Sequence, residues 1–130
     1  MSQRLLLDTH VLLWSLSAAD RISSRARRAM ERPGTKLAAS VVSVWEIVMK
    51  HQARKLNLRT GLTEFISQIL YRSPWAIVPV FAEHLLALAG VPQIHPDPFD
   101  RLFIAQALHE KMTIVTADEQ FEKYGIRTIW

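Results

Sequence analysis

Cysteine is absent from the 130 residues of this sequence. Its absence excludes disulfide bridges, thiolate zinc sites and cysteine nucleophiles. Long apolar runs are absent as well, because no segment reaches the ~18–20 consecutive apolar residues that a membrane span requires. Polar low-complexity tracts are also missing, and the charged fraction is an ordinary 22%. Together these features predict a chain that folds on its own core rather than a disordered or disulfide-stapled one.

The beginning of the chain resembles an export signal without meeting its requirements. Arg4 precedes an apolar stretch that extends to Leu16, and small residues follow it. However, Asp8 and His10 lie inside the stretch that would have to be apolar. We therefore expect no signal peptide, no membrane association and a cytoplasmic location.

Charge is distributed unevenly along the chain. Residues 1–72 contain twelve Lys and Arg against five Asp and Glu, a balance of +7, whereas residues 73–130 contain four against seven, a balance of −3. A basic half beside an acidic half suggests a polyanionic partner and a separate acidic site. Surface charge without function explains the composition equally well, so the motifs have to decide between the two.

Short apolar runs alternate with amphipathic segments along the chain. This pattern predicts strands at residues 4–7, 36–40, 75–80, 112–116 and 126–130. It predicts helices at residues 11–16, 22–32, 43–54, 60–71, 81–89 and 99–111. Strands that alternate with helices, without hairpin signals, indicate an α/β fold with an open parallel sheet. No repeat or linker divides the sequence, so we expect residues 1–130 to form a single domain.

Four acidic residues follow these strands, at the edge where open parallel sheets bind ligands. They are Asp8, Glu46, Asp100 and Asp118. Their separations are too large for helix periodicity to explain this common placement. Carboxylates that crowd together need a cation to stay ionised, and oxygen-rich sites suit Mg²⁺ or Mn²⁺. Such an ion can activate water for attack on a phosphodiester.

Helix capping is an alternative explanation for three of these acids. Glu46 stands three residues after a serine, as in a capping box, and Asp97 precedes a proline as an N-cap does, which leaves Asp100 in the first helical turn. Asp118 has the position of an N-cap for a short helix. Asp8 has no such explanation, because an aspartate between two apolar runs is costly to bury unless it is paired or ligated. No lysine stands at a motif position beside any of the four acids.

Basic residues of the first half have the spacing to hold the phosphates of a nucleic acid. Four arginines are spaced to share one face of the second predicted helix: Arg21, Arg25, Arg28 and Arg32. Lys50 with Arg54, and His51 with Lys55, form i,i+4 pairs on the next helix. A solvated helix face is the alternative for both groups, and it suits the lysine pairs better than the arginine stripe.

Four segments of the chain closely resemble motifs of the PIN-domain family and, within it, of the VapC-type toxins of bacterial toxin–antitoxin pairs. They occur in the expected order and spacing: RLLLDTHVLLW (4–14), SVVSVWEIVMK (40–50), HPDPFDRLFIAQA (95–107) and TIVTADEQF (113–121). The resemblance spans nearly the whole chain. It implies a three-layer α/β/α fold with a parallel sheet of about five strands.

The resemblance also implies an Mg²⁺- or Mn²⁺-dependent endoribonuclease, which hydrolyses RNA phosphodiester bonds with a metal-activated water. The catalytic acids of the family fall on Asp8, Glu46, Asp100 and Asp118. Asp8 and Asp100 then correspond to direct metal ligands, and Glu46 and Asp118 bind the metal directly or through water. Thr9 and Thr116 occupy positions where the family has a hydroxyl that supports the site.

Several residues near the four acids have more than one interpretation. Asp97 is a helix cap, an acid behind the metal ligands or an extra ligand. His10 and His95 flank the acids, and we expect them to hydrogen-bond a loop or an acid rather than to bind metal. Arg101 is adjacent to Asp100, which fits neutralisation of an acid, contact with RNA or contact with a partner.

The family further implies partners beyond the RNA substrate. These are a second copy in a homodimer and a VapB-like antitoxin, whose C-terminal segment lies over the active cleft. Residues 60–71 and 81–88 contain more apolar side chains than one small core requires, which favours an interface. The alternative to a nuclease is a PIN-like module that binds RNA or protein without cutting, but the intact set of four acids favours the nuclease.

Overall fold

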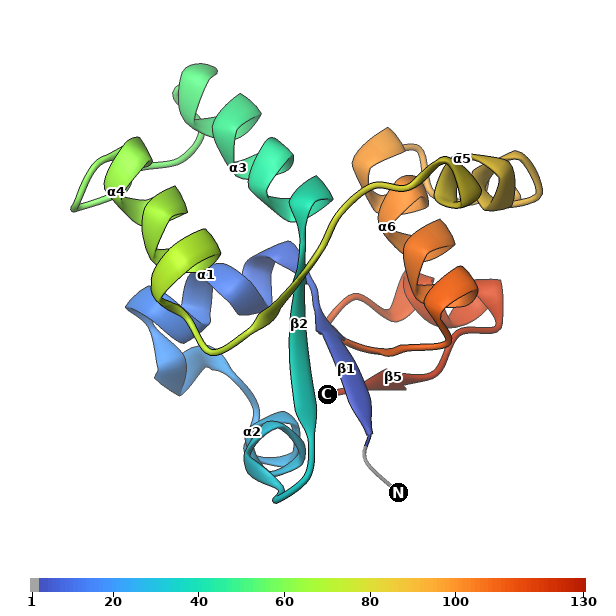
Figure 1. Cartoon of the computed structure of the whole chain (residues 1–130), viewed down its shortest axis with the longest axis horizontal. Coiled ribbons are helices and arrows are strands. Elements are labelled where there is room, and N and C mark those ends of the chain that lie inside the picture. The colour runs from blue at the N-terminus through green and yellow to red at the C-terminus, as the bar shows by residue number, and fades with distance from the viewer. Residues whose placement is uncertain (1–2) are drawn as a thin grey trace.

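The computed structural model describes residues 3–130 and has a five-stranded sheet at its centre (Figure 1). The strands are β1 Arg4–Leu7, β2 Lys36–Ser40, β3 Ala76–Val78, β4 Thr113–Val115 and β5 Thr128–Ile129. All neighbouring strands are parallel, in the order β3-β2-β1-β4-β5. The predicted parallel sheet is therefore confirmed. Strands β1 and β2 have the predicted bounds, and the other three are shorter than predicted.

Helices connect these strands in the predicted alternation. They are α1 Thr9–Ser17, η1 Ala19–Arg21, α2 Ser24–Glu31, α3 Val41–Gln52, α4 Leu62–Ser67, η2 Gln68–Arg72, α5 Ala82–Ala89, α6 Pro98–Glu110 and η3 Glu119–Tyr124. The helix predicted at 60–71 is present, but its second half, η2, is π-helical. Within residues 3–130, no helix is long and apolar enough to cross a membrane.

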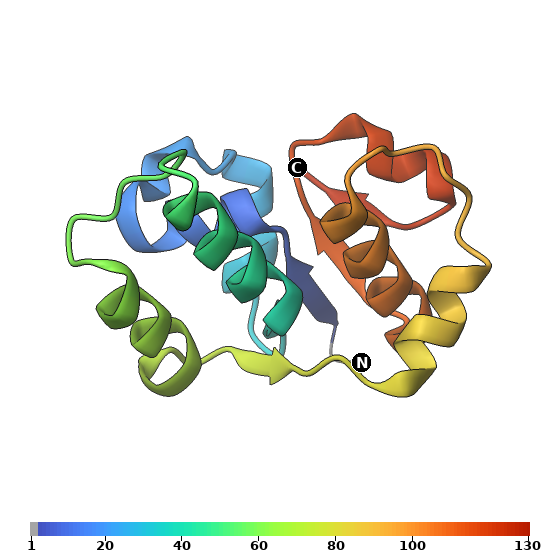
Figure 2. The same ribbon diagram turned by 90° about the horizontal axis from the view of Figure 1, so that it is seen from above.

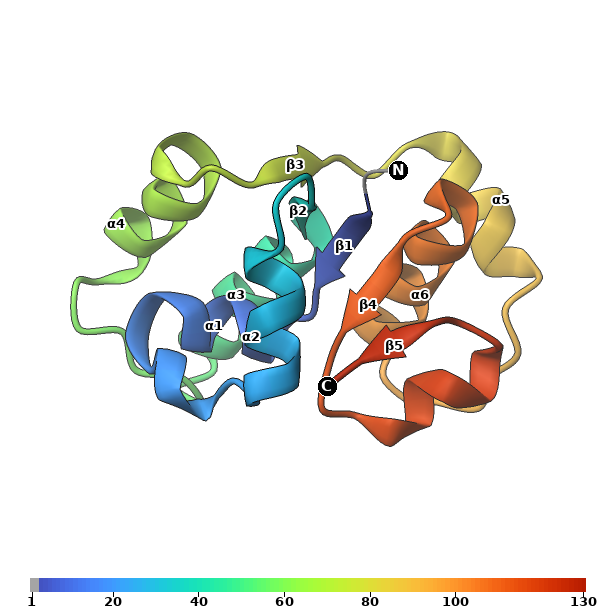
Figure 3. The same cartoon turned by 90° about the horizontal axis from the view of Figure 1, so that it is seen from below.

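Alternate residues of β1 face opposite sides of the sheet, as the pleat of a strand requires. Leu5 and Leu7 pack in one core with residues of α1 to α4. Leu6 packs in a second core with residues of α5 and α6. Figures 2 and 3 show α1–α4 on one side of the sheet and α5 and α6 on the other. The three-layer α/β/α fold is therefore confirmed, and burial of β1 on both faces explains its unbroken run of leucines.

The order of the strands reverses beside β1. Strands β2 and β3 lie on one side of β1, whereas β4 and β5 lie on the other. In open parallel sheets, the carboxyl ends of the two strands at such a reversal border a crevice. Leu7 and Val115, the last residues of β1 and β4, are paired partners. The residues that follow these two strands therefore start from the same point of the sheet edge.

Two strands lead into helices without a loop. Asp8 alone separates β1 from α1, and β2 ends at Ser40 immediately before α3 begins. Ser40 caps α3, because its Oγ accepts a hydrogen bond from the amide of Val42 at 2.9 Å. The predicted capping box of Ser43 and Glu46 is therefore wrong. The helix begins two residues earlier than predicted, which buries Ser43 and moves Glu46 to the second turn.

Gln106 of α6 is fully buried and joins three segments of the chain. Its Oε1 accepts a hydrogen bond from the Ser40 hydroxyl, and its Nε2 donates to the Pro79 carbonyl at 3.1 Å. The same Nε2 lies 3.4 Å from Nδ1 of buried His84 in α5. Because Ser40 is also fully buried, water cannot replace Gln106 as its acceptor.

Replacing Gln106 with Leu should lower the free energy of unfolding by about 2–3 kcal/mol, because the buried Ser40 hydroxyl loses its acceptor. Urea denaturation monitored by circular dichroism measures this loss. Gln52→Leu is the matched control, since Gln52 is exposed at the end of α3, and it should change the free energy by less than about 0.5 kcal/mol. Equal losses in the two variants would contradict the assigned role of Gln106.

Candidate active site

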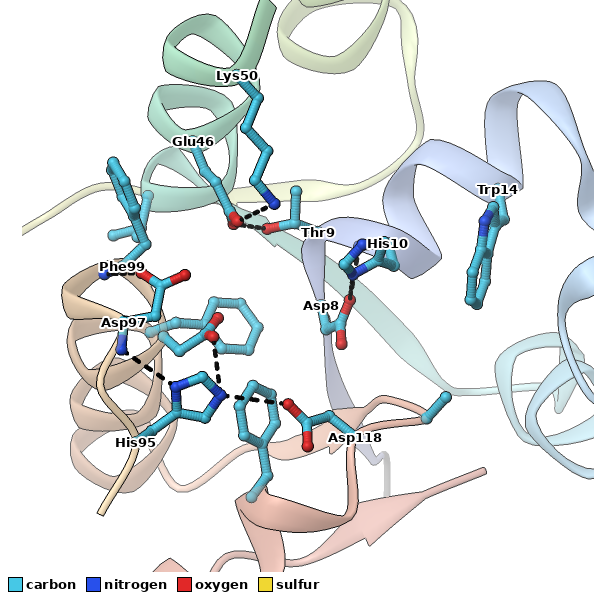
Figure 4. Close-up of a pocket in the computed structure, with 15 residues that line it drawn as sticks. Asp8, Thr9, His10, Trp14, Glu46, Lys50, His95, Asp97, Phe99 and Asp118 are labelled. Atoms are coloured by element: carbon cyan, nitrogen blue, oxygen red, sulfur yellow. Dashed lines mark hydrogen bonds and ion pairs between the residues drawn. The ribbon is translucent and has the colours of Figure 1, made fainter. Parts of the chain in front are cut away.

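A cavity of about 430 Å³ opens at the carboxyl edge of the sheet, between α1, α3 and α6 (Figure 4). Five carboxylates line it: Asp8, Glu46, Asp97, Asp100 and Asp118. Thr9 also lines the cavity, while Thr116 is buried at the end of β4. The four acids predicted from the sequence are therefore brought together, and the structure adds Asp97 to them.

Asp8 caps α1 and is nearly buried. Its Oδ1 accepts hydrogen bonds from the amides of His10 at 2.6 Å and Val11 at 3.3 Å, and its Oδ2 accepts one from the Thr116 hydroxyl. The expectation that Asp8 has no capping role is wrong, because α1 begins at the next residue. Burial raises the pKa of the Asp8 carboxyl, while the hydrogen bond from Thr116 opposes that rise.

Glu46 is 4% exposed and points from α3 into the cavity, as Figure 4 shows. Its Oε1 accepts a hydrogen bond from the Thr9 hydroxyl at 2.7 Å. The Thr9 hydroxyl also lies 2.9 Å from Oγ of Ser43. Both threonines that were predicted to support the site therefore contact acids, Thr9 on Glu46 and Thr116 on Asp8.

Lys50 enters the same cavity, and its Nζ lies 2.7 Å from Oε2 of Glu46. The solvated face that suited the lysine pairs therefore does not describe Lys50, which contacts an acid although no lysine stands beside one in a sequence motif. The i,i+4 spacing of Glu46 and Lys50 on one helix was the available signal. Burial lowers the pKa of Lys50, but the hydrogen bond to Glu46 and the charges of Asp97 and Asp100 outweigh it and raise the pKa above its ordinary value.

His95 contacts two of the acids, and Figure 4 shows its ring facing Asp118. Its Nε2 is 3.1 Å from Oδ2 of Asp100 and 3.4 Å from Oδ2 of Asp118. Its Nδ1 accepts a hydrogen bond from the backbone amide of Asp97 at 3.2 Å, which assigns the proton of the neutral ring to Nε2. The ring therefore offers a donor to the acids, in agreement with the hydrogen bonding expected of His95.

Capping and placement in the cavity occur together in two further acids besides Asp8. Asp97 caps α6 through Oδ1, which accepts from the amide of Phe99 at 2.9 Å. Asp118 caps η3 through Oδ1, which accepts from the amide of Gln120 at 2.9 Å, while its Oδ2 faces His95. Both predicted caps are confirmed. Helix capping and a role in the site are therefore not alternatives here, because Asp118 uses one oxygen for each.

The pKa of Asp100 shows how strongly this arrangement disfavours an ionised carboxylate. Burial and the neighbouring charge of Asp97 raise the pKa of Asp100 to about 7, against a partial lowering by His95. The charges of Glu46 and Asp8 make smaller contributions to the same rise. A divalent cation would relieve this repulsion, and carboxylate oxygens are suitable ligands for one. Ligand atoms of His95, Asp100 and Asp118 already lie within 4.8 Å of one another.

The predicted arginine stripe is divided, so the prediction of one continuous face is wrong. Arg21 ends η1 and is separated from α2 by extended backbone at Ile22, while Arg32 directly follows α2 as its C-cap. Arg21 lies over the ring of Trp14, 5.2 Å from its centroid. Arg25, Arg28 and Arg32 still line one hollow together, and Arg25 also borders a second hollow that contains three acids.

Two residues with open interpretations differ in their relation to the acids, because His10 lines the cavity whereas Arg101 does not. His10 is exposed, with its Nδ1 4.0 Å from Oδ1 of Asp8 and its ring 5.8 Å from that of Trp14. Arg101 does not line the cavity, and its Nε is buried without a hydrogen-bond partner within residues 3–130. Neutralisation of Asp100 by Arg101 therefore finds no support in the geometry.

Comparison with known proteins gives a consistent result. A family model described as PIN domain matches residues 5–126. Ribonuclease VapC22 of Mycobacterium tuberculosis (strain ATCC 25618 / H37Rv) is 28% identical over 121 residues, which cover 92% of this chain and 90% of that protein.

Solved structures are similar to this chain over nearly its whole length. The crystal structure of VapBC2 from Rickettsia felis, bound to a DNA fragment from its promoter, matches with a TM-score of 0.69 and 13% identity, and covers 97% of each chain. DNA-bound VapBC from Salmonella typhimurium matches with a TM-score of 0.67 and 16% identity over 97% of this chain and 96% of that one. At these identities the similarity establishes the fold.

The pKa of Asp100 in the metal-free protein should fall towards its ordinary value in the Asp97→Asn variant, because the neighbouring charge is removed. Asparagine also serves as an N-cap, so α6 keeps its start. Titration of the carboxyl carbon by NMR measures the change. Asp20→Asn, on exposed η1, is the control. An unchanged pKa in Asp97→Asn would contradict the assigned repulsion.

The same raised pKa predicts how stability depends on pH. The folded state holds the Asp100 proton more tightly than the unfolded state, whose pKa is near the ordinary 3.8. The resulting stabilisation is complete below about pH 4 and is lost as the pH rises through 7. Urea denaturation of the metal-free protein at pH 5 and pH 8 should show this loss more strongly in the wild type than in Asp100→Asn.

Proposed function

We propose that this chain, which belongs to the PIN domain family, is a divalent-metal-dependent endoribonuclease and the toxin of a toxin–antitoxin pair. The observation that carries the proposal is the meeting of five carboxylates with one lysine in a single cavity. Similarity to a protein named as a ribonuclease supports RNA as the substrate. RNA is a cytoplasmic substrate, so we place the chain in the cytoplasm.

The donor set of the cavity fits Mg²⁺ or Mn²⁺, both of which prefer carboxylate oxygens. In this proposal Asp8 and Asp100 hold the ion directly, and Glu46 and Asp118 hold it directly or through water. The raised pKa of Asp100 supports the assignment, because burial and the negative charge of its neighbours both disfavour its ionised form, and a divalent cation offsets both effects. When bound, the ion supplies a lower pKa for a water molecule and stabilises negative charge on the phosphodiester.

The chain's own groups would keep the acids oriented during hydrolysis. The Thr116 hydroxyl and two backbone amides hold the Asp8 carboxylate. Thr9 and Lys50 hold the carboxylate of Glu46, and the Lys50 ammonium weakens the repulsion that an approaching phosphate meets. Water then attacks phosphorus in line with the departing 3′ oxygen. This route needs no 2′-hydroxyl nucleophile and leaves a 5′-phosphate and a 3′-hydroxyl.

Asp100→Asn should slow cleavage of a single-stranded RNA by roughly 100-fold or more, because it removes the charge of a proposed metal ligand. The initial rate on end-labelled RNA with Mg²⁺ or Mn²⁺ measures the effect, and a chelator should abolish cleavage by the wild type. Asp8→Asn should behave similarly, and since asparagine still caps α1, that variant tests charge rather than folding.

Asp20→Asn is the matched control for both variants, because Asp20 is exposed in η1 and does not line the cavity. It should cleave at the wild-type rate. Cleavage by Asp100→Asn or Asp8→Asn at that same rate would disprove the site assignment. A wild type that binds RNA but does not cut it with either metal would favour the non-catalytic binding module instead.

The proposal includes two protein partners, a VapB-like antitoxin and a second copy of the chain. Solved VapBC assemblies of similar fold support the first. An exposed apolar face of α5 supports the second, since Leu85 is 53% and Leu86 76% exposed. The apolar residues predicted as surplus in 60–71 are largely used by the core, because Phe65 and Ile69 are buried there.

Leu86→Arg should convert the proposed dimer to a monomer, because a charge would have to be buried at an apolar interface. Multi-angle light scattering across a concentration series measures the mass. Tyr71→Arg is the control, since Tyr71 is 80% exposed on η2, outside α5, and it should leave the mass unchanged. A wild type that stays monomeric at high concentration would contradict the dimer.

A further inference from the structure

A second cavity adjoins the candidate active site. Its volume is about 530 Å³, and it lies between α1, the segment 55–60 and the start of α4. His10, Trp14 and Lys50 line both this cavity and the site with the five carboxylates. The two cavities therefore border each other at these three side chains, so a chain molecule bound in one passes close to the other.

The two cavities have opposite charge. Four cations line the second cavity, which we call the basic groove: Arg21, Lys50, Lys55 and Arg59. No aspartate or glutamate is among its lining residues within the described part of the chain. The sign of the charge changes at Lys50, whose ammonium is bound to Glu46 on the acidic side.

The cations of the basic groove are carried by an ordered backbone. The amide of Lys55 donates to the carbonyl of Lys50 at 2.9 Å, which ties the loop to the end of α3. Leu56 and Leu58 pack against the core and lie between the exposed residues Lys55 and Arg59 in the sequence. The guanidinium of Arg21 is stacked on Trp14. The backbone that carries Lys55 and the side chain of Arg21 are therefore already ordered, which lowers the entropy lost when they bind a ligand.

The charge pattern decides from which side a polyanion can reach the acids. The carboxylates of the site repel the phosphates of a nucleic acid. A phosphate can approach them only where a bound cation neutralises the charge. A strand therefore lies most favourably with its flanking phosphates on the cationic side. The α2 arginines are less suitable, because the hollow that Arg25, Arg28 and Arg32 line is separate, and none of them lines the cavity with the five carboxylates or the basic groove.

We infer that the basic groove binds the phosphodiester backbone of the RNA strand on one side of the bond that is cut. This inference rests on the proposed function and extends it, because it assigns Arg21, Lys55 and Arg59 as substrate-binding residues. Lys50 marks the point where the strand passes from the groove to the acids. Of the arginines proposed from the sequence, only Arg21 belongs to this path.

Equilibrium binding tests the groove separately from cleavage. Fluorescence anisotropy of a labelled single-stranded RNA, measured in chelator at several salt concentrations, gives the Kd and its salt dependence. The double variant Lys55→Ala/Arg59→Ala should bind roughly tenfold more weakly at moderate salt, and the slope of log K against log salt should fall by about 1.4, because two phosphate contacts are lost at about 0.7 each.

Lys36→Ala/Arg127→Ala is the matched control. It removes the same charges from exposed positions at the amino ends of β2 and β5, away from the acidic edge. Its salt slope should stay near the wild-type value. Equal losses of affinity and slope in the two double variants would overturn the inference. The inference would also be overturned if Lys55→Ala/Arg59→Ala bound RNA like the wild type but lost the binding of a glutamate-rich peptide. That result would assign the groove to a protein partner.

Cleavage by the wild type with Mg²⁺, assayed in parallel, separates the two proposals. If the wild type cleaves RNA and the groove variant binds RNA as well as the wild type does, the groove assignment alone is disproved. Weakened RNA binding in the groove variant, with a wild type that never cleaves, removes the nuclease and leaves the groove as an RNA-binding surface.

Discussion

Repulsion among carboxylates at one edge of a parallel sheet is the constraint on which the rest of the site depends. The strand order reverses between β1 and β4, so the segments that follow both strands open on one crevice. Helices α3 and α6 add their acids from the two opposite layers of the fold. Burial and this concentration of negative charge together raise the pKa of Asp100 to about 7. Every other polar group nearby can be understood as a response to that charge.

The responses are of two kinds, and each has its own structural source. Helix N-termini supply backbone amides to Asp8, Asp97 and Asp118, which orient the acids and lower the cost of their charge. Side chains supply the remaining donors, namely two threonine hydroxyls, the Lys50 ammonium and the His95 ring. Because these donors come from distant parts of the sequence, the site forms only when the sheet and both helical layers are assembled.

The sequence predicts the elements better than it predicts the directions of side chains. Apolar runs buried on both faces predict β1 and β2 to the residue, and Asp97 before a proline predicts the start of α6. The start of α3 was placed two residues late, because Ser40 is both the last residue of a strand and a helix cap. The position of Lys50 depends on how α3 is rotated against the cavity, which is a tertiary property. The division of the arginines arises from two residues of extended backbone that helical spacing alone does not reveal.

The junction of β1 and α1 has a consequence for how this protein can change during evolution. A single residue, Asp8, joins the two elements. Asp8 and the next residue, Thr9, both line the cavity of the candidate active site. An insertion here would turn every following residue of α1 by about 100° around the helix axis, which would move its buried face out of the core. Variation in length is therefore excluded at this junction. Variation in length can instead occur in the surface segment 53–61, where it alters the lining of the basic groove without disturbing the acids.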